Sequence, residues 1–217
     1  MTRRGRIILK LCVWALGLAP VAALLYWFVT DDLTANPISF ITNTLGDWTL
    51  RLLFASLAMT PLRLAFGLAW PIALRRLLGL FAFFMAGLHF GVWILLDHFF
   101  DWREMGADIV KRPYVTMGML ALVSLLPLAA TSTSGMIKRL GARNWRRLHR
   151  LAYAAAVLAV LHFVWLAKVG RTEPYVYATI LALLFAVRLW DGARRLWARR
   201  RRDTGLSASA WPGSRLP

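Results

Sequence analysis

The chain has 217 residues, 59% of which are hydrophobic, and its mean hydropathy is +0.56. Soluble domains are nearer half apolar, and here the apolar residues form long runs, so the composition excludes an ordinary soluble domain and indicates an integral membrane protein. The formal net charge of +17 lies beside these runs, which argues against nucleic-acid binding. The single cysteine, Cys12, excludes an intrachain disulfide and a cysteine-based metal site.

Six apolar runs approach the length of about 20 residues that a transmembrane helix needs. The predicted helices are, in chain order, Ile7–Val29, Asp47–Ala69, Leu77–Phe99, Tyr114–Ala130, Leu148–Val169 and Tyr175–Trp190. The first run is longer than the apolar region of a signal peptide, so we interpret it as an uncleaved helix. The fold class is therefore all-α, a membrane bundle of about six helices that occupies residues 1–192.

The segments between the runs are polar or charged and are expected to be connections. Residues 30–37 are polar, 101–113 are mixed in charge and 136–147 are basic. Residues 193–217 are first Arg-rich and then rich in Ser, Gly and Pro, and we expect a basic, disordered tail there. None of these segments is long enough to fold alone, so any chemistry belongs to the bundle or its two faces.

Positive charges are concentrated on alternate connections, which lie on one side of the predicted bundle, and they set its orientation. One side carries Arg3, Arg4, Arg6, Lys10, Arg75, Arg76, Lys138, Arg139, Arg143, Arg146, Arg147, Arg150, Arg194, Arg195 and Arg199 to Arg202. The opposite connections are acidic or mixed. Because cytoplasmic loops are enriched in Lys and Arg, both termini are predicted to be cytoplasmic.

Two of the four histidines are predicted to lie at the same depth in the membrane. Thirteen residues separate Arg76 from His89, and thirteen separate His149 from His162, on helices that both start at the basic face. At 1.5 Å per residue each histidine lies roughly 20 Å from that face. Facing histidines in a helical bundle suggest bis-histidine haem ligation. The alternative is two separate histidines, each hydrogen-bonded to the protein; a zinc site would want further ligands.

The other two histidines are predicted to lie at the boundaries. His149 is embedded in a basic cluster at the inner face, where it either ligates a second cofactor or is an ordinary interfacial residue. His98 falls on nearly the opposite helix face from His89, so we do not expect it to ligate haem. Arg51 lies near the depth of the histidine pair and is a candidate partner for a haem propionate. Its alternative is to extend toward the outer interface.

Several segments resemble the MsrQ (YedZ) family, whose transmembrane domain is similar to that of ferric reductases, NADPH oxidases and STEAP proteins. The segments that carry the resemblance are 46–53, 59–63, 75–80 with His89, 111–118, 127–132, and 144–153 with 162–165. They occur in order, within a core of about 40–190. His149 and His162 match the family's histidine pair, whereas the helix of His89 carries one matching histidine where NADPH oxidases have two.

The resemblance implies a b-type cytochrome of the bacterial inner membrane that also binds FMN. It would be an electron-transfer subunit with no catalytic residues of its own. Electrons would come from the quinone pool or a cytosolic flavin reductase and pass to MsrP, a periplasmic molybdenum protein that reduces methionine sulfoxide. Basic residues of the inner face, Arg75 and Arg147 among them, would then be candidates to bind a flavin phosphate or an acidic donor.

Two other classes of function remain open from the residues alone. One is a transporter that uses intramembrane histidines as a proton relay. The other is a structural membrane anchor for a periplasmic enzyme. A visible spectrum distinguishes both from a cytochrome.

Overall fold

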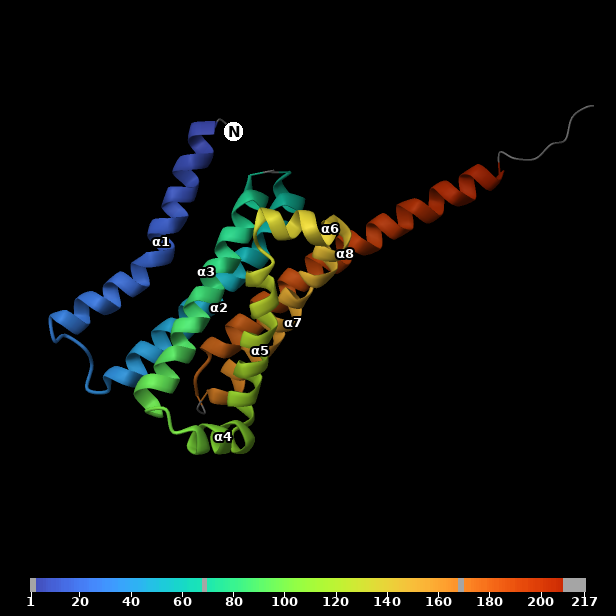
Figure 1. The fold of residues 1–217 in the computed structure, drawn as a ribbon. Helices are drawn as coiled ribbons and strands as arrows, with labels where there is room; N and C mark the ends of the chain where they lie inside the picture. The colour runs from blue at the N-terminus through green and yellow to red at the C-terminus, as the bar shows by residue number, and fades with distance from the viewer. Residues whose placement is uncertain (1–2, 68–69, 168–169, 209–217) are drawn as a thin grey trace, which may run out of the picture.

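The computed structural model describes residues 3–67, 70–167 and 170–208, and every regular element in these ranges is helical (Figure 1). The elements are α1 (Arg3–Val29), α2 (Pro37–Phe66), α3 (Pro71–Val92), the π-helical turn η1 (Trp93–Asp97), α4 (Trp102–Lys111), α5 (Pro113–Ala130), α6 (Ser134–Leu148), α7 (Leu151–Leu166) and α8 (Glu173–Ala208). The all-α prediction is confirmed.

Five helices are long and apolar enough to cross a membrane, namely α1, α2, α3 with η1, α5 and α8. The pair α6 and α7, bent by 43°, forms a sixth if it is taken as one span. Large apolar side chains such as Leu16, Phe28 and Leu183 are more than 60% exposed, which suits a surface surrounded by lipid. The chain is therefore a multi-pass membrane protein, as predicted.

The bundle has two distinct ends, which we name by the short helices that lie there. In Figure 1, α4 lies across one end, and α6 lies at the other end together with the start of α1 and the far part of α8. We call these the α4 end and the α6 end. The arginine-rich segments gather at the α6 end, as the alternation of charge along the sequence predicts.

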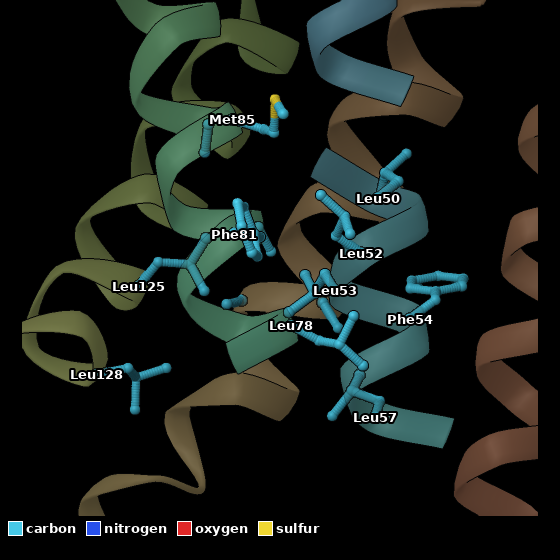
Figure 2. Packing of buried hydrophobic residues seen from close by; sticks show 14 of the residues in the cluster. Leu50, Leu52, Leu53, Phe54, Leu57, Leu78, Phe81, Met85, Leu125 and Leu128 are labelled. Atoms are coloured by element: carbon cyan, nitrogen blue, oxygen red, sulfur yellow. The ribbon is translucent and has the colours of Figure 1, made fainter. Parts of the chain in front are cut away.

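The core lies between α2, α3, α5 and α7, where α2 packs along α3 and α5 packs along α7. Figure 2 shows buried side chains of α2, α3 and α5 gathered between these helices, among them Leu53, Leu57, Phe81, Met85 and Leu125. Leu57 and Met85 are 1% and 0% exposed. In contrast, α1 packs on α2 and α3 at the edge of the bundle.

Helix α2 begins ten residues earlier than the predicted start at Asp47. The Asn36 side chain accepts a hydrogen bond from the Ser39 amide at 3.1 Å, and Pro37 occupies the first turn. A side-chain cap followed by proline is a strong helix start, because that proline lacks an N–H that would have no partner in any case. The predicted ends at Ala69 and Val169 lie outside the described residues.

Two segments that were predicted as connections form short helices instead. Asp101 caps α4 by accepting from the amides of Arg103 and Glu104, and the Thr133 hydroxyl caps α6. Both helices are amphipathic rather than apolar, so a criterion based on long apolar runs does not detect them.

Helix α8 continues past its predicted end at Trp190 and runs to Ala208. Arginine is a good helix former, and Arg195 pairs with Asp191 one turn earlier at 2.9 Å. The helix therefore extends through the Arg-rich part of the segment 193–217, and residues 209–217 lie outside the described part of the chain.

Candidate haem site and its charged mouth

A cavity lies among α2, α3, α5 and α7, toward the α4 end of the bundle. Most of its lining is apolar, including Leu50, Leu53, Phe90, Leu125 and Phe163. His89 of α3 and His162 of α7 both line it. The structure thus brings together the two histidines that helix length alone placed at one depth.

Each of these histidines is held by a backbone carbonyl through the same ring nitrogen. His89 Nδ1 lies 2.9 Å from the Thr42 carbonyl oxygen, and His162 Nδ1 lies 2.6 Å from the Tyr114 carbonyl oxygen. A carbonyl oxygen only accepts, so in both rings Nδ1 carries the proton and Nε2 keeps its lone pair. Such second-shell bonds orient metal-ligating histidines and raise their basicity.

The separation and orientation of the two rings suit ligation of one metal from opposite sides. The ring centroids are 6.2 Å apart and the ring planes are inclined by 84°. A metal–imidazole bond is about 2 Å long, so two rings on either side of a metal ion have centroids about 6 Å apart. The donor set and its spacing therefore fit haem iron with two axial histidines.

Two glycines make room for these rings. A Cβ on Gly118 of α5 would lie 2.9 Å from His162 Nδ1, and one on Gly46 of α2 would lie 3.3 Å from His89 Cε1. A side chain at position 118 would force His162 or α5 to shift, and one at position 46 would press His89 by a smaller amount. Sequence analysis missed this role, although both glycines lie in segments that carry the family resemblance, because it depends on which helix faces meet.

The mouth of the cavity carries charged residues of both signs. Arg112, Asp47 and Asp97 line it. Arg112 Nη1 lies 3.1 Å from Asp108 Oδ2 and 3.4 Å from the Tyr114 hydroxyl. Arg112 lies in the segment 111–118 that carries the family resemblance, but an arginine in a mixed-charge connection was not distinguishable there as a site residue.

Arg51, the predicted propionate partner, does not line this cavity. Its Nε donates to the Tyr177 hydroxyl of α8 at 3.2 Å, and its Nη2 lies 3.8 Å from Asp47 Oδ2. It lies instead in a separate groove between α2 and α8, with Glu173 and Tyr177. The predicted depth does not determine which side of α2 Arg51 faces. In the structure it faces Tyr177 of α8 and points away from the histidines.

His98 is also outside the cavity lining. It is 6% exposed, its Nε2 lies 3.2 Å from Asp108 Oδ2, and its ring lies 4.5 Å from that of Trp93. It therefore joins η1 to α4 and does not face His89 or His162.

At the α6 end, His149 is also held by a backbone carbonyl through its Nδ1 atom, as His89 and His162 are. Its Nδ1 donates to the Trp145 carbonyl at 3.1 Å, and its ring stacks on Trp145 at 3.8 Å. Its Nε2 is buried without a hydrogen-bond partner among the described residues. Arg75 Nη1 reaches the Thr60 hydroxyl at 3.5 Å, and Arg147 is exposed.

Arg188 is a further half-buried residue near this end that was not selected from the sequence. From α8 it donates to the Leu57 carbonyl of α2 and lies over the Tyr153 ring at 5.3 Å. The Leu57 carbonyl is free for it because its helical partner would be the amide of Pro61, which has no N–H. An arginine within the last turn of the predicted membrane helix Tyr175–Trp190 was the available signal.

Comparison with known proteins defines first the class and then the family. Residues 45–160 match the family described as ferric reductase like transmembrane component. The chain is therefore a membrane protein of the ferric-reductase-like class.

Curated relatives narrow this further. One from Herminiimonas arsenicoxydans is 46% identical over 94% of this chain and 92% of its own length. One from Rhodospirillum rubrum is 55% identical over 77% of this chain and 81% of its own length. One from Ralstonia nicotianae is 45% identical over 86% and 88%. All three are named protein-methionine-sulfoxide reductase heme-binding subunit MsrQ, and the chain belongs to the MsrQ family.

Proposed function

We propose that this chain is a b-type cytochrome that carries electrons across the bacterial inner membrane to a periplasmic methionine sulfoxide reductase. The observation that supports it most is the pair His89 and His162, with ring centroids 6.2 Å apart and both Nδ1 atoms committed to backbone carbonyls. The names of the relatives, which state heme binding and a reductase subunit, support the same function.

In this proposal His89 and His162 would hold the haem iron through their Nε2 atoms, and Gly46 and Gly118 leave the space their rings need. Haem, when bound, supplies reversible one-electron chemistry that no side chain of the bundle offers. The chain's own part is to hold both Nε2 atoms in place and to surround the site with apolar side chains that limit water access.

The acceptor in this proposal docks at the α4 end. Reduction of a methionine sulfoxide to the thioether takes two electrons and two protons and releases water. An MsrP-type molybdenum subunit, which the family resemblance implies, is the proposed site of that reaction. The cavity lies toward the α4 end, which shortens the distance an electron travels to a partner bound there.

The donor side is the α6 end, which we place in the cytoplasm. His149 is the proposed ligand of a second haem, because its buried Nε2 has no other partner in the described part of the chain. Arg75 and Arg147 are proposed to bind the FMN phosphate. Either the quinone pool or a cytosolic flavin reductase would deliver the electrons.

A visible spectrum of the purified, haem-replete protein tests the proposal. We expect sharp α and Soret bands on reduction, and loss of those bands in His89→Ala and in His162→Ala. His98→Ala is the matched control and should keep them, since His98 does not line the cavity. A wild-type protein without these bands would exclude a cytochrome and favour a transporter or an anchor.

The orientation has its own test. Cys12 is first replaced by Ser, and a single cysteine is then introduced at Arg103 of α4 or at Arg143 of α6. A membrane-impermeant maleimide added to spheroplasts should label only the first variant. Labelling of the second variant alone would reverse the proposed direction of electron flow.

A further inference from the structure

The mouth of the histidine cavity contains a cation that is held in place by its neighbours. Arg112 lies between α4 and α5, directly before Pro113, which favours extended backbone at the preceding residue. Its φ and ψ are −114° and 94°, and its amide donates to the Asp108 carbonyl at 2.9 Å. The backbone therefore fixes where this side chain begins.

The contacts of Arg112 use only part of its hydrogen-bonding capacity. Both side-chain partners, Asp108 at 3.1 Å and the Tyr114 hydroxyl at 3.4 Å, are on Nη1. A guanidinium has five N–H donors in a planar fork. Within the described residues Nη2 and Nε have no such partner, so one edge of the fork is available to a ligand.

The other charges at the mouth have neighbours of their own. Asp47 Oδ2 lies 3.8 Å from Arg51 Nη2, and Asp97 Oδ2 lies 3.7 Å from His98 Nδ1. Among the described residues that line the cavity, Arg112 is the only arginine or lysine. An anionic group of a ligand in this cavity would therefore find its charge partner in Arg112.

We propose that Arg112 binds the carboxylates of the ligand held by His89 and His162, which are the propionates of the haem proposed above, and that Asp108 positions it. This inference rests on the proposed function. It transfers to Arg112 the role that sequence analysis gave to Arg51. Arginine suits it, because its fork can bind a carboxylate through two parallel hydrogen bonds.

The test measures how fast wild type and arginine variants lose two forms of the cofactor. Full-length protein is loaded either with haem or with haem dimethyl ester, whose propionates are neutral, and loss to excess apomyoglobin is timed. With haem, Arg112→Gln should lose cofactor about fivefold to tenfold faster than wild type. Arg112→Lys should recover part of this difference. Arg103→Gln, an exposed neighbour on α4 with the same change of charge, should match wild type.

With the dimethyl ester, wild type and Arg112→Gln should lose cofactor at the same rate, since the interaction needs carboxylates. Arg112→Gln should also lower the midpoint potential of the haem, because a nearby cation disfavours the more positive ferric state. Asp108→Asn should also speed the loss of haem, by less than Arg112→Gln does, because it removes a partner of Arg112 and leaves the arginine in place.

Three results would overturn the inference. The first is that Arg112→Gln and Arg103→Gln retain haem equally. The second is that the Arg112→Gln difference persists with the ester, which would mean that Arg112 acts through the fold. The third serves if Arg112→Gln does not fold: wild-type protein then retains haem and haem dimethyl ester equally well, which would show that the carboxylates contribute nothing to binding. Failure of wild type to bind haem would instead overturn the proposed function.

Discussion

The two ends of the bundle use histidine in similar ways but carry very different charge. At the α4 end, His89 and His162 face each other across an apolar cavity, and charges of both signs surround its mouth. At the α6 end, His149 has a buried Nε2 that finds no hydrogen-bond partner within residues 3–67, 70–167 and 170–208, and it lies among arginines. The difference teaches that the net charge of +17 marks one end of the bundle, whereas the proposed cofactor sites depend on ring nitrogens held by backbone carbonyls at both ends.

The largest expected effect concerns the space beside His162. Gly118→Ala would place a methyl group 2.9 Å from Nδ1, inside normal contact distance, so the His162 ring or α5 must shift and the bond to the Tyr114 carbonyl is strained. We expect this variant to lose most of its haem absorbance. Gly46→Ala, with 3.3 Å to His89 Cε1, should lose less.

Gly91→Ala on α3 is the control for these variants, because a Cβ there meets nothing within 4 Å. Normal absorbance in Gly118→Ala would show that the cavity tolerates movement of His162. The site at the α4 end would then be less rigid than the carbonyl bonds indicate.

A second experiment compares the two ends directly. His149→Ala should lower the haem-to-polypeptide ratio, measured as the pyridine haemochrome, while the bands that depend on His89 remain. An unchanged ratio would mean that the α6 end binds no haem and that the similarity of the ring environments has no counterpart in function.

A third prediction concerns stability at the α6 end rather than cofactor binding. Arg188→Ala leaves the buried Leu57 carbonyl without a donor, which costs about 1–3 kcal/mol of unfolding free energy. Thermal unfolding in detergent would measure it. In a Pro61→Ala background the new amide can pair with Leu57, so Arg188→Ala should cost less. Equal costs in the two backgrounds would show that Arg188 acts through other contacts.

The smallest expected effect is in the extended part of α8. Asp191→Ala removes an ion pair with Arg195 one turn away, and such exposed pairs contribute about 0.3–0.5 kcal/mol. Hydrogen exchange of α8 should change slightly, with no change at the cavity. Loss of haem absorbance in this variant would mean that the two ends are coupled.

Sequence reasoning predicted well what depends on distance along a helix. The rise per residue and the basic boundaries placed His89 and His162 at one depth, and the structure brings their rings together. It could not predict what depends on direction around a helix. Arg51 has a suitable depth but faces Tyr177, and the need for glycine at positions 46 and 118 arises only where two helix faces meet.

The helices α4 and α6 show a second limit. Both are short and amphipathic, and their stability comes from caps at Asp101 and Thr133 and from lying at the ends of the bundle. A criterion based on apolar runs treats such segments as connections. The polar contacts around Arg112 and Asp108 depend on α4, so they could not be foreseen without it.

The bond between Arg188 and the Leu57 carbonyl has a consequence for biogenesis. Pro61 leaves α2 with an unpaired acceptor in the membrane, and its donor comes 131 residues later. During synthesis the Leu57 carbonyl of α2 has no donor until α8 has been made. The stability of α2 therefore depends on a helix that is synthesised much later. A chain truncated before α8 would carry an unpaired carbonyl at a buried position, which is a defect that membrane quality control could detect.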